Sequence, residues 1–159
     1  MQTIAPKSSP RSWITLAIFI AVVVVVGGLI GSQTNTGEWY QSLDKPPFNP
    51  PAWLFPPVWF TLYVMIAVAG WLTWHRDRSS AAMKVWFAQL VLNWAWTPTF
   101  FVAHLLWPAF AIIILLLASI ILFILAVRRH DAVSAWLFVP YALWVAFAAL
   151  LNLTIALAN

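Results

Sequence analysis

The sequence predicts an all-α integral membrane protein, in which five transmembrane helices form one bundle and residues 1–159 are a single domain. Three observations support this prediction. Hydrophobic residues make up 64% of the 159 residues and charged residues only 8%. The mean hydropathy is +0.89. The apolar residues gather in long runs that short charged or proline-rich segments separate. A water-soluble domain of this size needs more charge on its surface, so the soluble classes are excluded.

The five apolar runs set the expected order of the helices. Each run is long enough to cross a bilayer at about 1.5 Å per residue. Pro56 and Pro57 fall in the first turn of the second run, where a missing amide donor would be unpaired in any case. We expect transmembrane helices at about residues 13–31, 53–74, 81–103, 108–127 and 132–158.

The basic residues indicate the orientation of the helices in the membrane. Every Lys and Arg except Lys45 falls in segments that five spans place on the same side as the amino terminus. The positive-inside rule therefore predicts a cytoplasmic amino terminus and a first loop outside. Helical spans favour the inner membrane if the source is bacterial, since outer-membrane proteins are usually barrels. The basic groups stand beside apolar runs, which indicates topology signals and a lipid bilayer rather than nucleic acid as partner.

The loop over residues 32–52 separates the first two spans. The stretch from Glu38 to Trp59 is rich in aromatic residues and has prolines at positions 46, 47, 50, 51, 56 and 57. Prolines fix the backbone φ angle and remove amide donors, so we expect a stiff, extended path with no continuous helix, in a loop that holds its shape without secondary structure. A rigid aromatic loop at the membrane edge predicts a lid over a pocket.

Two spans carry polar and aromatic residues at helical spacing. Gln89, Asn93, Trp96 and Phe100 follow one another at intervals of four, three and four residues, so they share one face of the third span. A side-chain amide in hydrocarbon costs free energy unless it is paired, so this face should point into the bundle. Two interpretations stay open: the amides join helices to one another, or they contact a ligand.

The fifth span repeats the pattern with Tyr141, Trp144, Ala148 and Asn152. Trp59 and Tyr63, four residues apart on the second span, and Tyr40 and Trp53 near the loop could complete a pocket of flat rings. Its expected ligand is large, flat and apolar. The competing interpretation, that the twelve tryptophans form interfacial belts, suits those near span ends but fits Trp96 and Trp144 less well.

The charged residues leave little room for catalysis. All four acidic residues fall in expected loops, so no buried carboxylate pair and no ion-coupling charge is expected at mid-membrane. His75, His104 and His130 have no spacing that assembles a metal or haem site. We therefore expect no metal and no required cofactor.

Several motifs in a fixed order resemble the tryptophan-rich sensory protein/translocator protein family (TspO, the peripheral-type benzodiazepine receptor family). The similarity extends from Trp13 to Asn152. The motifs that carry it are Trp39-Tyr40-x-x-Leu43-x-Lys45-Pro46 with Pro50-Pro51, Trp59-x-x-Leu62-Tyr63, Gln89-Leu90-x-x-Asn93-Trp94-x-Trp96-x-Pro98-x-Phe100-Phe101, Val139-Pro140-Tyr141-x-x-Trp144 and Leu151-Asn152.

The resemblance implies a five-helix bundle, commonly a homodimer, that binds porphyrins such as protoporphyrin IX, sterols and synthetic benzodiazepine-type ligands under the first loop. It further implies light- and oxygen-dependent porphyrin degradation in some bacterial members, with tryptophans like Trp59 and Trp144 involved. The ligand-binding residues that it implies are Tyr40, Pro50, Trp53, Trp59, Asn93, Trp96, Tyr141, Trp144 and Ala148.

One departure from the family pattern argues against a strong cholesterol function. The vertebrate sterol motif has a tyrosine where this chain has Leu153, and no basic residue follows. The sequence therefore predicts a membrane receptor for porphyrins that senses, moves or helps to degrade them. The alternatives are a true porphyrin-degrading oxygenase, a small-molecule carrier and a regulatory partner protein.

Overall fold

Helices form the whole regular structure of the computed structural model, which describes residues 10–34 and 36–159. The described residues contain six α-helices, a short 3-10 helix and no strand. Five α-helices are long, and α2 has only five residues. The elements in chain order are α1 (Pro10–Gly31), α2 (Glu38–Ser42), η1 (Ala52–Leu54), α3 (Phe55–Asp77), α4 (Ala81–Phe101), α5 (Leu106–Val127) and α6 (Ala132–Ala158).

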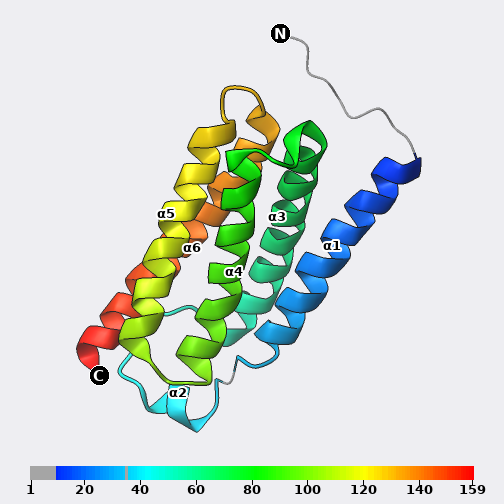
Figure 1. Cartoon of the computed structure of the whole chain (residues 1–159). Coiled ribbons are helices and arrows are strands. Elements are labelled where there is room, and N and C mark those ends of the chain that lie inside the picture. The colour runs from blue at the N-terminus through cyan, green and yellow to red at the C-terminus, as the bar shows by residue number, and fades with distance from the viewer. Residues whose placement is uncertain (1–9, 35) are drawn as a thin grey trace.

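The long helices pack side by side in a bundle, with α1 along its outside (Figure 1). The short turns between α3 and α4 and between α5 and α6 lie at one end, which we call the turn end. The segment that joins α1 to α3 and contains α2 lies at the other, which we call the loop end. Helix α1 packs chiefly against α3, α3 also packs against α6, and α5 packs against both α4 and α6.

Four long helical segments have the length and composition to cross a membrane: α1, η1 with α3, α5 and α6. Helix α4 has 21 residues but is not among them. It carries Lys84, Gln89, Asn93 and Pro98, which lower its hydropathy, and it buries both amide side chains inside the bundle. The all-helical membrane architecture is thus confirmed, whereas the crossing by α4 stays a prediction.

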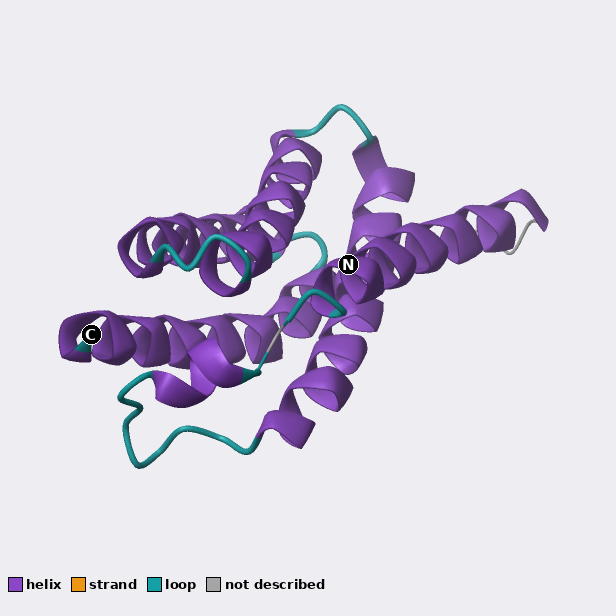
Figure 2. Cartoon of the chain, turned by 90° about the horizontal axis from the view of Figure 1, so that it is seen from below, coloured by secondary structure: helices purple, strands orange, loops and turns teal. Residues whose placement is uncertain are grey.

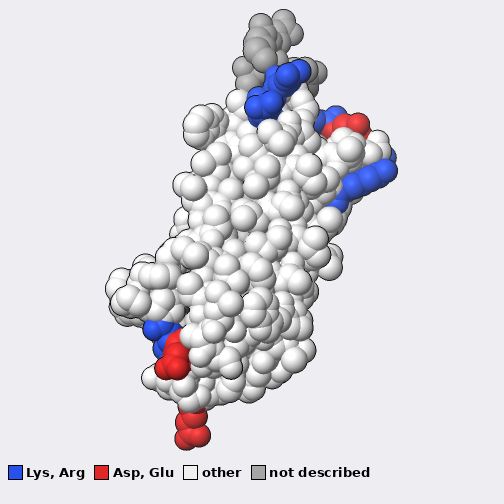
Figure 3. All heavy atoms as spheres, turned by 90° about the vertical axis from the view of Figure 1, so that its left-hand side faces the viewer, with Lys and Arg blue, Asp and Glu red and all other residues white. Residues whose placement is uncertain are grey.

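The charges lie at the two ends of the molecule. One face of the space-filling view has Lys, Arg, Asp and Glu only near the ends, with an uncharged band between them (Figure 3). Large apolar side chains such as Ile18, Leu29, Leu115 and Leu122 are exposed on α1 and α5. This distribution suits a bilayer around the middle of the bundle. Lys7, which the orientation prediction also uses, lies outside the described residues.

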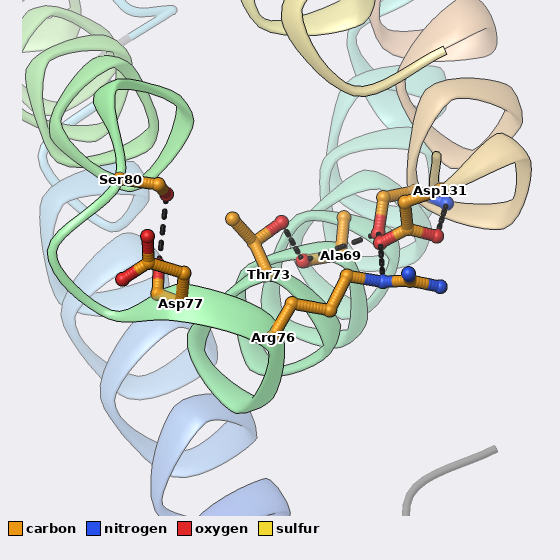
Figure 4. Close-up of polar contacts among 7 residues, drawn as sticks. Ala69, Thr73, Arg76, Asp77, Ser80 and Asp131 are labelled. Atoms are coloured by element: carbon orange, nitrogen blue, oxygen red, sulfur yellow. Dashed lines mark hydrogen bonds and ion pairs between the residues drawn. The ribbon is translucent and has the colours of Figure 1, made fainter. Parts of the chain in front are cut away.

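An ion pair between the exposed Arg76 and the buried Asp131 joins α3 to the start of α6 at the turn end (Figure 4). Arg76 Nε lies 3.2 Å from Asp131 Oδ2, and Asp131 is only 2% exposed. The same carboxylate caps α6, because it accepts hydrogen bonds from the Ser134 amide at 3.1 Å and from the Ser134 hydroxyl at 2.6 Å. Its negative charge at a helix amino terminus is favourable. These contacts fasten the turn end.

Two glycines allow helices to approach closely. A Cβ atom at Gly27 of α1 would lie 2.5 Å from the Tyr63 ring of α3, and a Cβ atom at Gly70 of α3 would overlap the Trp86 ring of α4. The Trp86 indole N–H donates to the Ile66 carbonyl at 3.0 Å, which holds that ring in place. The small residues of α1 thus serve packing within the chain at Gly27, while a Cβ atom at Gly31 would meet nothing within 4 Å.

The loop is more structured than the prolines predict. The expectation that this loop lacks secondary structure was wrong, because Glu38–Ser42 forms α2. The start of α3 at Phe55 agrees with the expected second span. Glu38–Ser42 contains no proline, and the Lys45 ammonium group caps its end by donating to the carbonyls of Tyr40, Gln41 and Leu43 at 2.6, 3.3 and 2.9 Å. Cations at a helix carboxyl terminus are favourable.

Candidate functional site

A cavity of about 530 Å³ lies at the loop end between α1, α3, α4 and the loop. Helix α3 contributes a ladder of rings to its wall, including Phe55, Trp59 and Tyr63. These rings lie four residues apart, so they share one helix face. The Trp59 and Tyr63 ring centroids are 5.6 Å apart. The ladder gives the cavity a flat aromatic wall.

Helix α1 supplies the facing wall, which no pocket prediction from the sequence included. Val24, Gly27, Gly28 and Gly31 line the cavity. Nothing lies within 4 Å of the Cβ position at Gly28 or Gly31, so the absent side chains leave open space there. The signal in the sequence was the group of glycines near the end of the first span. Small residues at this spacing allow another helix to approach closely. The space beside the glycines became visible only in the folded chain.

Trp96 of α4 lines the cavity, and a hydrogen bond to α6 fixes the orientation of its ring. Its indole N–H donates to Asn152 Oδ1 at 3.1 Å, and the Asn152 amide donates to the Leu106 carbonyl at 3.0 Å. Three helices, α4, α5 and α6, therefore meet at this pair of contacts. The side-chain amide of Asn152 therefore hydrogen-bonds to Trp96 and does not line the main cavity.

A chain of buried hydrogen bonds runs from the cavity wall into the bundle. The Tyr63 hydroxyl donates to Asn93 Oδ1 at 3.1 Å, the Asn93 amide donates to the Tyr141 hydroxyl at 2.8 Å, and that hydroxyl donates to Gln89 Oε1 at 2.8 Å. These bonds connect α3, α4 and α6. The amides of Gln89 and Asn93 thus make the contacts that the helix-joining interpretation requires.

A second cavity, of about 20 Å³, lies behind the first. Ala148 of α6 is 5% exposed and lines it together with Leu151 and Asn152. Tyr40 and Trp96 line both spaces. The small cavity is therefore separated from the large one by aromatic side chains rather than by backbone. A larger side chain at Ala148 would press on these separating rings.

The structure brings some of the expected ligand-binding residues together and leaves others apart. Tyr40, Trp59 and Trp96 line the main cavity, and Ala148 lines the small one. Asn93 and Tyr141 lie behind the wall in the hydrogen-bonded chain. The remaining expected residues line neither cavity: Pro50 is half-buried in the loop, Trp53 is 70% exposed, and the Trp144 ring packs 5.9 Å from that of Phe55.

Contacts of residues 39–49 hold the loop over the cavity. The Trp39 ring stacks on His104 at 3.9 Å, with 11° between the planes, and the Tyr40 hydroxyl donates to Asn49 Oδ1 at 3.0 Å. The Asn159 side chain accepts from the Asp44 amide and donates to its carbonyl. Figure 2 shows α2 beside the carboxyl end of α6, where these contacts lie. The Asn159 side chain thus links the loop to the end of α6.

The environment of Tyr40 changes its ionisation. Burial raises the pKa of its phenol above the ordinary value, and the hydrogen bond with Asn49 offsets only part of this effect. The Lys45 ammonium lies 4.9 Å from the centre of the same ring. Tyr40 therefore stays neutral over the physiological range and acts as a hydrogen-bond donor.

The site contains no assembled catalytic or metal-binding group among the residues described. No Asp, Glu, Lys, Arg or His side chain lines the main cavity in residues 10–34 and 36–159. The same residues contain no cluster of three or more His, Asp and Glu that could hold a metal ion. The side chains that line the main cavity can make aromatic contacts and hydrogen bonds.

Comparison with known proteins agrees with the motifs and the helices. The family model of the TspO/MBR family matches residues 16–158. The chain is similar to the translocator protein of Ovis aries, at 36% identity over 86% of this chain and 85% of that protein. It is also similar to the tryptophan-rich protein TspO of Chlorobaculum tepidum, at 36% identity over 92% of this chain and 96% of the relative. Protein CrtK of Rhodobacter capsulatus is 32% identical over 89% and 91% of the two chains. The chain therefore belongs to the TspO/MBR family.

Proposed function

We propose that this chain is a membrane binding protein for porphyrins such as protoporphyrin IX and for related flat, apolar ligands. One observation carries the proposal: the loop end encloses a cavity of about 530 Å³ with a ladder of aromatic rings along one wall. Pockets for small molecules and cofactors typically have about 300–1,000 Å³ and apolar, aromatic walls. Aromatic faces favour stacking with a flat conjugated ligand.

The proposed ligand-binding set keeps the residues expected from the sequence, with different roles. Tyr40, Trp59 and Trp96 would contact the ligand at the cavity wall. The small side chain of Ala148 would leave room for the Trp96 ring in its observed position. The other expected residues, Pro50, Trp53, Asn93, Tyr141 and Trp144, would shape the loop and the rear of the wall.

The proposed membrane arrangement has five spans within a single domain. Helix α4 would be the fifth span, because its 21 residues reach about as far as the other helices and its polar side chains point into the bundle. The amino terminus would be cytoplasmic and the loop outside, in the inner membrane if the source is bacterial. A homodimer would bury part of the apolar exterior. We infer this arrangement from the family membership and from the distribution of the charged residues.

The physiological role would be sensing, transport or light-dependent degradation of the porphyrin. Relatives of this chain are named translocator protein and tryptophan-rich sensory protein, and these names support the first two roles. For degradation we propose photosensitised oxidation by the bound porphyrin, with molecular oxygen as the oxidant and with Trp59 and Trp144 as electron or radical partners. Multiple turnovers would instead favour a true oxygenase, if Trp59→Phe and Trp144→Phe abolish the reaction but keep binding. Ligand-driven movement across vesicles would favour a carrier.

The first experiment is a titration of the purified protein with protoporphyrin IX in the dark, followed by tryptophan fluorescence, and then a repeat under light. We expect saturable quenching in the dark and product only in light. Ala148→Leu should weaken binding, because Ala148 is 5% exposed and lines the small cavity. Ala146→Leu is the matched control, since Ala146 is exposed on the same helix. The absence of saturable quenching would favour a partner protein without a porphyrin ligand.

A further inference from the structure

The basic side chains of the chain are concentrated at the turn end. Among the described residues, Lys45 is the one Lys or Arg at the loop end (Figure 1). The others lie at the turn end: Arg11, Arg76, Arg78, Lys84, Arg128 and Arg129. Asp77 and Asp131 accompany them, so the turn end is net positive, whereas Glu38 and Asp44 make the loop end net negative.

The cations at the two ends differ in how they are used. Lys45 donates to three backbone carbonyls, and Arg76 is paired with Asp131. No other Lys or Arg side chain in residues 10–34 and 36–159 forms an ion pair or donates a hydrogen bond to a described residue. A guanidinium group has five N–H donors whose arrangement fits phosphate oxygens. The turn end therefore presents donors and positive charge that an anion can use.

The turn between α5 and α6 presents its cations without a competing carboxylate. Arg128 and Arg129 are adjacent and both exposed. Asp131, the acidic residue of this turn, is 2% exposed, and its carboxylate is engaged by Arg76 and Ser134 (Figure 4). The ion pair with Arg76 thus neutralises the carboxylate that would otherwise attract the two neighbouring arginines.

The turn between α3 and α4 differs in this respect. Asp77 is exposed next to Arg78, and its carboxylate accepts hydrogen bonds only from the amide and the hydroxyl of Ser79. These donors are neutral, so Asp77 keeps its negative charge beside Arg78. The α3–α4 turn therefore attracts an anion less than the α5–α6 turn, although both lie at the same end of the bundle.

The helices on both sides of the α5–α6 turn expose apolar side chains directly after the arginines. Leu125 of α5 is exposed, and so are Val133 and Trp136 of α6. Trp136 is 72% exposed and lies five residues after Asp131, about 7.5 Å along the helix. Tryptophan favours the boundary between membrane and water. A phospholipid would meet the apolar surface and the guanidinium groups together, whereas an acidic protein in water would reach only the guanidinium groups.

We propose that the α5–α6 turn is a binding site for the headgroup of an anionic phospholipid such as phosphatidylglycerol. Arg128 and Arg129 bind the phosphate oxygens, and an acyl chain lies along Val133 and Trp136. Basic groups beside membrane helices on the cytoplasmic side commonly bind anionic headgroups, and the proposed orientation places the turn end on that side. The site lies at the opposite end of the bundle from the main cavity, so it is independent of the ligand proposed there.

The first test titrates the full-length protein in detergent with phosphatidylglycerol and with phosphatidylcholine, and counts bound lipids by native mass spectrometry. One cation near an anionic surface contributes about fivefold in affinity, so the parent should bind phosphatidylglycerol about thirtyfold more tightly. Arg128→Gln/Arg129→Gln should reduce this preference to about threefold or less. The matched control, Arg78→Gln/Lys84→Gln, removes the same charge from the same end and should keep a preference of at least about tenfold.

Three outcomes of this titration would overturn the proposal. The first is a parent without a preference for phosphatidylglycerol. The second is an equal loss in both double variants, which would mean diffuse attraction to the whole turn end. The third is full competition by glycerol 3-phosphate at the same concentration, which would mean a site for a soluble phosphate. We expect no such competition, because glycerol 3-phosphate has no acyl chain to cover the exposed apolar side chains.

The second test locates the lipid. Brominated acyl chains quench the fluorescence of tryptophans that they touch, and in bilayers brominated phosphatidylglycerol should quench the parent more than brominated phosphatidylcholine does. Trp136→Phe should remove most of this difference. Trp107→Phe is the matched control, because Trp107 is also exposed but lies at the loop end, in the first turn of α5. An equal effect of the two substitutions, or none in Trp136→Phe, would overturn the proposed location.

Discussion

The contact between Gly27 and Tyr63 allows a sharp test of how α1 closes the cavity. In Gly27→Ala the new Cβ atom would lie 2.5 Å from the Tyr63 ring, whereas ordinary contacts begin near 3.4 Å. The ring would have to retreat by the difference, about 0.9 Å. Its hydroxyl is hydrogen-bonded to Asn93 at 3.1 Å, so the retreat would stretch that bond or push α1 away.

The expected energies follow from overpacking and helix propensity. Forcing an extra carbon into a packed contact costs about 1–3 kcal/mol. Alanine in place of glycine within a helix returns up to about 1 kcal/mol. The matched control is Gly28→Ala, where nothing lies within 4 Å of the new atom. We therefore expect Gly27→Ala to be about 1–3 kcal/mol less stable than Gly28→Ala, which corresponds to a Tm lower by about 2–4 °C for each kcal/mol.

The assay is thermal unfolding of the purified protein in detergent, followed by circular dichroism, together with porphyrin titration. A second comparison is Gly70→Ala, whose Cβ atom would overlap Trp86 away from the cavity. Gly70→Ala should lower the Tm but change the Kd for protoporphyrin IX little, whereas Gly27→Ala should change both. A Tm for Gly27→Ala equal to that of Gly28→Ala would refute the packing argument.

Three further perturbations address the two ends of the bundle. Asp131→Asn should lower the free energy of unfolding by about 1–3 kcal/mol, because it leaves Arg76 without its buried partner. The turn variant Asp77→Asn should lower it much less, and equal losses in chemical denaturation would contradict this. Lys45→Met should raise the dissociation rate of bound porphyrin about three- to tenfold in stopped-flow experiments, because α2 loses its cap; an unchanged rate would mean that the loop is no lid. Since burial raises the pKa of Tyr40, the closed loop should keep its stability below the ordinary phenol pKa and lose it as the pH rises through the raised value. The Tm between about pH 8 and about pH 11 should then fall more steeply in the parent than in Tyr40→Phe.

Much of the architecture was predictable because a bilayer imposes simple rules on a sequence. Long uncharged runs must be helices, and the helix boundaries at Ala81, Val127, Ala132 and Ala158 agree with the expected ranges. The spacing of residues on the third span was enough to predict that Asn93 and Trp96 face the interior, where both are buried. Local composition misled the prediction only in the loop, where a five-residue helix precedes the prolines.

Periodicity also predicted which helix face carries the aromatic residues, but not which neighbour that face would meet. Trp59 and Trp96 line the cavity, while Trp144, on an equally regular stripe, packs against Phe55 outside it. To predict that Tyr63 pairs with Asn93, one must know the distance between α3 and α4. To predict the open space beside Gly28 and Gly31, one must know the position of α1.

The sequence by itself thus determined that the chain is helical, where its helices run, which faces are buried and to which family it belongs. The tertiary structure decided that α1 forms a wall of the cavity and that Asn93 makes hydrogen bonds with Tyr63 and Tyr141. The reason is physical. Helix formation and membrane burial depend on neighbours along the chain, whereas a cavity and a hydrogen bond between helices depend on which distant side chains meet.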